Sequence, residues 1–148
     1  SSNAVYGSKD ACTILTQAVA DKVLGAGAQK GTNTPNTSSS DVSVSTCTYT
    51  SATGDSLESV RNMKAASLLV RAPLTATGAD SNNEPFRTLK SGASEVSGYG
   101  EKAFWDPAMG QLNILKEGTW YILSVGKTKV TEHTVADAQA FAQSMSLK

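Results

Sequence analysis

The chain has 148 residues, a length that suits one domain with a hydrophobic core of its own. Its 13 Lys and Arg residues balance its 13 Asp and Glu residues, and this net charge of zero argues against nucleic acid as a partner. No run reaches the roughly 18 apolar residues that a transmembrane helix needs. Only 39% of the residues are hydrophobic, and an uncharged polar surface of this kind is more usual outside cells.

The opening Ser-Ser-Asn-Ala, residues 1–4, is typical of the scar left by a cleaved expression tag. We therefore expect a single domain over residues 5–148, secreted or held at the cell envelope, with any export signal or lipid anchor removed upstream. Residues 26–41 and 74–83 are rich in Ser, Thr, Asn and Gly. We expect both to be mobile polar loops, because such segments bury too little apolar area to offset the entropy lost on ordering.

Helix and strand patterns alternate in the first half of the chain. Apolar residues recur at helical spacing over residues 10–24 and predict one helix or two short ones, stopped by Gly25. Residues 42–51 are rich in Val and Thr and predict a strand, followed by a turn over residues 52–55. Residues 57–71 permit a helix or a strand, and we predict a strand.

The second half predicts a short helix, a three-stranded meander and a closing helix. The short helix starts at Asn83, a capping residue followed by a proline. The first strand of the meander begins at residue 103, and the second covers residues 111–116. The third begins at residue 119, after a tight turn. Thr134 caps the last helix. The predicted fold is α+β, a curved antiparallel sheet of about four to five strands with N-terminal and C-terminal helices packed on one face.

The tight hairpin carries apolar residues on both of its faces. A two-residue loop pairs Leu115 with Trp120 and sorts the side chains by alternation. The longer, core face then carries Leu112, Ile114, Tyr121, Leu123 and Val125. The candidate binding surface on the other face consists of Trp105, Leu115, Trp120 and Ile122. Two alternatives remain open, namely that a helix or loop covers this face or that a bulge changes the register.

No constellation of residues specifies a reaction or a metal site. The single histidine, His133, lies in a polar stretch before a helix cap, where we expect a solvated loop residue. No motif places a base beside a serine nucleophile. Glu95, Glu101 and Asp106 could converge near the turns of the sheet as an acid/base pair, but their spacing gives this no support. We expect no catalytic residue, no cofactor and no metal.

The two cysteines, Cys12 and Cys47, admit either a disulfide, which we expect, or two buried thiols. Their spacing matches no metal or redox motif. Closing a loop of about 35 residues would stabilise the fold by about 4 kcal/mol in the chain-entropy model. A bridge would also fit an oxidising compartment.

Four short motifs together resemble small exported bacterial proteins, often lipoproteins, of uncharacterised function. They are DACTILT at residues 10–16, VLG at 23–25, CTY at 47–49 and GYGEKAFW at 98–105. The resemblance implies a helical start tied by a disulfide to the first strand, and supports the pairing of Cys12 with Cys47. The order of helix and then sheet is also similar to half of the β-lactamase inhibitor protein, whose sheet presents aromatic residues to a target.

Three functions follow as hypotheses. The first is a non-catalytic secreted or envelope-anchored binding module, which uses the aromatic sheet face to hold an envelope or extracellular protein. The second is a small-molecule or lipid-binding domain with a cleft between sheet and helix. The third is a hydrolase acting through Glu101 or Asp106.

Overall fold

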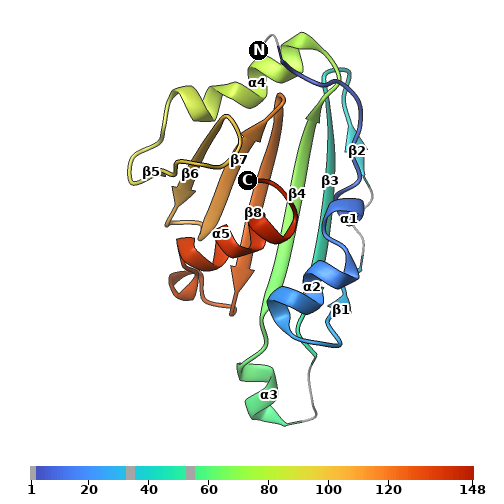
Figure 1. Ribbon diagram of the computed structural model, residues 1–148, viewed down its shortest axis with the longest axis vertical. Helices are drawn as coiled ribbons and strands as arrows, with labels where there is room; N and C mark the ends of the chain where they lie inside the picture. Colours follow the sequence, from blue (N-terminus) through green and yellow to red (C-terminus); the bar gives the residue numbers. More distant parts are fainter. Residues whose placement is uncertain (1–2, 33–35, 53–55) are drawn as a thin grey trace.

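The fold is built on one antiparallel sheet with helices on both of its faces (Figure 1). The computed structural model describes residues 3–32, 36–52 and 56–148, so the first two residues of the expected tag scar and most of the turn predicted at 52–55 lie outside the described residues. Within them the sheet has eight strands in the order β1-β3-β4-β8-β7-β6-β5, with β2 also paired to β3. The α+β class and the antiparallel sheet are confirmed, whereas four to five strands was too few.

The strand count differs because three of the strands are too short for a sequence pattern. The five longer strands are β3 (Val42–Thr50), β4 (Ala65–Pro73), β6 (Lys102–Asp106), β7 (Gln111–Lys116) and β8 (Thr119–Gly126). The three short ones are β1 (Gln29–Lys30), β2 (Thr37–Ser38) and β5 (Ser94–Glu95). Both residues of each short strand are exposed, so the apolar alternation that identifies a strand is lacking. The polar segment predicted as a loop over residues 26–41 therefore contributes two edge strands.

Helices α1 (Ala11–Ile14), α2 (Gln17–Leu24) and α5 (Val135–Ser144) pack on one face of the sheet (Figure 1). The N-terminal pattern thus forms two short helices, because the Thr16 side chain accepts a hydrogen bond from the Val19 amide and starts α2. The core lies between these helices and the sheet. Its fully buried side chains include Leu15, Leu68, Leu112, Ile114, Leu123 and Phe141.

The opposite face, called the outer face below, is covered in part by α4 (Ala76–Arg87). The predicted loop over residues 74–83 was therefore wrong, whereas the placement of the N-terminal and C-terminal helices on one face is confirmed. The composition of this segment favours a loop, because Gly, Ser and Asn are weak helix formers. Its helix is capped by Thr75, whose side chain accepts a hydrogen bond from the Gly78 amide, and is held by tertiary contacts.

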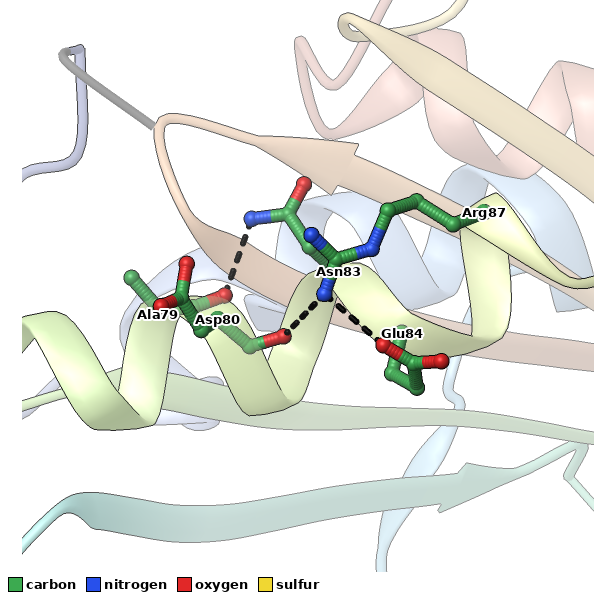
Figure 2. A network of polar contacts seen from close by, with 5 residues as sticks. All are labelled: Ala79, Asp80, Asn83, Glu84 and Arg87. Carbon is green, nitrogen blue, oxygen red and sulfur yellow. Dashed lines mark hydrogen bonds and ion pairs between the residues drawn. The ribbon is translucent and has the colours of Figure 1, made fainter.

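Polar contacts within α4 stabilise its exposed side (Figure 2). The Arg87 guanidinium donates to the Asp80 carbonyl at 3.4 Å and pairs with the Glu84 carboxylate at 2.8 Å. The Asn83 amide donates to the Ala79 carbonyl at 2.9 Å. These bonds lie around Pro85, which has no amide hydrogen to donate to the preceding turn.

Residues 57–71 are partly helical, which corrects the strand predicted for the whole segment. The short helix α3 (Leu57–Arg61) begins after Ser56, whose side chain accepts a hydrogen bond from the Ser59 amide, and β4 starts only at Ala65. Helix α3 lies at the far end of the β3–β4 hairpin, away from α4 (Figure 1). The 3-10 turn η1 (Val130–Glu132) then joins β8 to α5.

Candidate functional site

The four residues of the predicted binding surface do not share one face. The hairpin register is confirmed, since Leu115 pairs with Trp120. Trp105 pairs with Leu112, a core residue, and packs against the core on the opposite side of the sheet. The outer face instead receives Phe104 of β6, which pairs with Asn113.

Helix α4 covers the aromatic part of the outer face. The Phe86 ring of α4 meets Phe104 with centroids 5.0 Å apart and Trp120 with centroids 6.1 Å apart, both edge to face. Leu115 beneath them is only 4% exposed. The Trp120 indole donates to the Asn113 side chain at 2.9 Å. The alternative in which a helix packs over this face is therefore the one observed, without a change of register.

Ile122 lies two pairs beyond Trp120 along β8, at the next position on the same face, between Leu69 of β4 and Asn113 of β7. It is half-buried, as is Leu69. The residues next along this face, Ser67 and Ser124, are small and polar. Of the four predicted residues, Ile122 is thus the one whose neighbours are mainly small or polar rather than aromatic.

The disulfide is confirmed between Cys12 and Cys47, with Cα atoms 5.1 Å apart. It joins the α1 region to the middle of β3. The Ala11 amide adds a hydrogen bond of 2.8 Å to the Ser45 hydroxyl on the same strand. The disulfide and this hydrogen bond together hold the N-terminal helices on the sheet.

Two of the three carboxylates predicted as a possible acid/base pair, Glu101 and Asp106, accept hydrogen bonds from backbone amides of turns. The Glu101 carboxylate accepts from the Glu117 amide, at 2.9 and 3.0 Å, in the tight β7–β8 turn. Asp106 is buried, forms an ion pair of 2.5 Å with Lys90 and accepts hydrogen bonds from the amides of the β6–β7 turn. Glu95 shares with Glu101 a hollow of about 280 Å³ that Asp106 does not line. The three carboxylates therefore do not converge.

His133 is half-buried, which corrects the expectation of a solvated loop residue. Its Nε2 lies 2.7 Å from the Lys127 carbonyl and its Nδ1 lies 3.1 Å from the Gly110 carbonyl. Side chains at Gly110 and Gly126 would approach the ring within 3 Å, because ideal Cβ atoms there lie 2.9 and 2.6 Å from it. The imidazole thus links two connecting loops, and among the described residues its hydrogen-bond partners are backbone carbonyls rather than a serine or cysteine.

A larger hollow, of about 480 Å³, lies where β4 begins and β8 ends, beside α2 and α5. Its charged lining consists of Lys22, Lys64, Lys127, Glu132 and Asp137. Its remaining lining consists of Val23, Val125, Gly126, Ala140 and Ser144. We call this hollow the lysine cleft.

The three lysines of the lysine cleft form no direct contact with a carboxylate in the described part of the chain. Within the described residues, the side chains of Lys22, Lys64 and Lys127 form no ion pair or hydrogen bond, and the two ion pairs there lie elsewhere. The last cross-strand pair of β4 and β8 at this end is Ala65 with Gly126. Lys64 comes directly before Ala65 in the chain, and Lys127 comes directly after Gly126. Two like charges thus stand at neighbouring ends of adjacent strands.

Sequence reasoning missed this cleft because its charges come from three distant segments. Lys22 belongs to α2, Lys64 precedes β4 and Lys127 follows β8. The sequence carried little signal, since Lys64 lies inside the segment predicted as a strand over residues 57–71, and pairing of β4 with β8 spans a long connection that periodicity does not specify. Knowledge of the strand order was needed to bring them together.

Two further findings bear on the kind of site. In the described part of the chain, no three His, Cys, Asp or Glu side chains gather closely enough to hold a metal ion. Over the same residues, no helix combines the length and apolar character needed to cross a membrane.

Comparison of the chain with family models, with curated proteins and with solved structures gives no match. Its function is therefore inferred from its own geometry.

Proposed function

We propose that this chain is a non-catalytic, extracytoplasmic domain that binds a small molecule in the lysine cleft. The observation that carries the proposal is a hollow of about 480 Å³, between two helices and the sheet, lined by three lysines that form no ion pair among the described residues. Its size lies within the range usual for small-molecule sites. The Cys12–Cys47 disulfide supports a location outside the cytoplasm.

The cleft is a better candidate than the aromatic sheet face. Binding anchors in protein interfaces are large side chains that reach the partner. Leu115 is 4% exposed, and the Trp120 ring rests against Phe86 of α4. A partner could reach these groups only if α4 moved away, which would expose the apolar cluster that α4 now covers.

The elements that border the cleft are held in place before any ligand binds. Helices α2 and α5 pack against each other and on the sheet, and the disulfide ties the α1 region to β3. The Thr134 side chain accepts a hydrogen bond from the Asp137 amide and so fixes the first turn of α5. A preformed cleft loses little conformational entropy on binding, which favours affinity.

Contacts of the acidic side chains and of the histidine support a role without catalysis. Glu101 and Asp106 are engaged with backbone amides of turns, and Asp106 also pairs with Lys90. Both ring nitrogens of His133 face backbone carbonyls. An acid or base needs a free path to a substrate proton, which these contacts obstruct.

A steric block tests the proposed site. Ala140 lies on α5, is exposed and lines the cleft, so Ala140→Trp fills the cleft without changing charge. The probes are organic acids, sugar phosphates, amino acids and neutral sugars, screened by thermal shift and native mass spectrometry. We expect one class to raise the melting temperature of the unmodified chain and to lose that effect in Ala140→Trp.

The matched control is Ala136→Trp, one helical turn earlier on α5, exposed and outside the cleft lining. This variant should keep the ligand response. A response that survives Ala140→Trp, or a screen in which no probe binds, would refute the proposed function.

A further inference from the structure

The lysine cleft contains a pair of like charges that the fold itself does not explain. Ala65 of β4 pairs with Gly126 of β8 as the last cross-strand pair, and a lysine lies just beyond each of them, Lys64 before β4 and Lys127 after β8. Like charges close to each other at the ends of adjacent strands repel. Neither ammonium group has a carboxylate within ion-pair distance among the described residues. An anion placed between them would remove this repulsion.

A third cation lines the same hollow. Lys22 is in the last turn of α2, where a positive charge also suits the helix C-terminus. The three lysines outnumber the two carboxylates of the lining, although the chain as a whole has a net charge of zero. The charged lining therefore has a net charge of +1 in a concave place, which favours an anion over a cation there.

The two carboxylates of the lining lie on other elements than the Lys64–Lys127 pair. Asp137 is in the first turn of α5, where the partial positive charge of a helix N-terminus favours a carboxylate. Glu132 is on the η1 turn. The two carboxylates thus come from η1 and α5, and the sheet end contributes only lysines to the charged lining.

The remaining walls strengthen an electrostatic contact at this end. Val125 is 6% exposed, and Val23 and Ala140 add apolar surface. Charges interact more strongly beside such walls than in open water. The volume of about 480 Å³ leaves room for an organic group attached to the anion.

We infer that the ligand is a small organic anion whose carboxylate or phosphate group binds between Lys64 and Lys127, an inference that rests on the proposed function. Lys22 contributes from the α2 side. Lysine binds either anion as a point charge, so the shared chemistry is the negative group itself.

The test is isothermal titration calorimetry at low ionic strength with three probes. Citrate supplies carboxylates, glucose 6-phosphate supplies a phosphate, and glucose is the neutral probe. The double variant Lys64→Gln/Lys127→Gln should weaken binding of the preferred anion by about ten-fold or more, because each lost contact is charge-assisted. Lys64→Arg/Lys127→Arg should retain most of the affinity.

The matched control is Lys129→Gln, which removes one positive charge from the neighbouring loop but from outside the cleft lining. Its affinity should stay within about two-fold of the unmodified chain, because an exposed charge is screened. A preference for citrate assigns the site to carboxylates, and a preference for glucose 6-phosphate assigns it to phosphates. Equal losses in Lys129→Gln and in the double glutamine variant would overturn the inference.

The two proposals fail in different ways. If a neutral sugar from the earlier screen binds, loses its binding in Ala140→Trp and is unaffected by the glutamine variants, the ligand is not an anion and only the present inference fails. If no probe responds to Ala140→Trp, the lysine cleft is not a binding site and the proposed function fails with it.

Discussion

Tyr121 shows how the position of a single residue sets its chemistry. It lies on the core side of β8 and is 6% exposed. Burial, and then the nearby Glu117 carboxylate, raise the pKa of Tyr121 above its ordinary value of 10.0. In the unfolded chain the phenol ionises near pH 10.0, whereas the folded chain still holds the proton.

This difference predicts a loss of stability at alkaline pH. Above pH 10.0 the unfolded state binds fewer protons than the folded state, so the free energy of unfolding falls as pH rises toward the folded pKa of Tyr121. Tyr121→Phe should show a shallower fall, measured by urea unfolding at a series of alkaline pH values. Tyr6→Phe, at a residue that is 49% exposed, is the control. Identical pH slopes for the unmodified chain and Tyr121→Phe would contradict the assignment.

Side-chain direction was predictable where a turn restricts the register. The two-residue β7–β8 turn sets Leu115 opposite Trp120, and alternation then assigned each face of that hairpin correctly. The β6–β7 turn leaves four residues between Asp106 and Gln111. Loops of that length occur in several geometries, so the sequence did not specify which face Trp105 joins.

Helix α4 shows at the scale of an element how tertiary contacts override propensity. Asn82 is fully buried and uses its whole amide group. Its Oδ1 accepts from the Arg71 Nε at 2.7 Å, and its Nδ2 donates to the carbonyls of Arg71 and Gly118, each at 2.9 Å. These bonds join α4 to β4 and to the β7–β8 turn, a link that no local pattern encodes.

We predict that Asn82→Ala destabilises the fold by about 2–3 kcal/mol, because it leaves buried polar groups without partners. Urea unfolding followed by tryptophan emission measures the change. Asn83→Ala is the control, since Asn83 bonds only within its own helix (Figure 2). That variant should cost less than about 1 kcal/mol. Equal losses for the two variants would show that the buried network does not hold α4.

At the scale of the whole molecule, local periodicity was sufficient for the fold class and for four of the five longer strands, whereas residues 57–71 permitted a helix or a strand and β4 was not delimited. It also predicted the closing helix, whose pattern lies within one short segment, while the disulfide was expected from the two cysteines and the resemblance. It could not assign α4 to the outer face, because helix placement depends on which sheet face remains uncovered. The lysine cleft depends on strand order and on packing between α2 and α5, both of which arise only in the folded chain.

Chemical-shift mapping of the backbone amides during titration with citrate and glucose 6-phosphate tests the account most directly. We predict that the anion that binds shifts resonances of Lys64, Gly126, Lys127 and Ala140, with the outer face unchanged. Shifts gathered instead around Trp120, Ile122 and Leu69 would place the ligand on the outer face and contradict the lysine cleft.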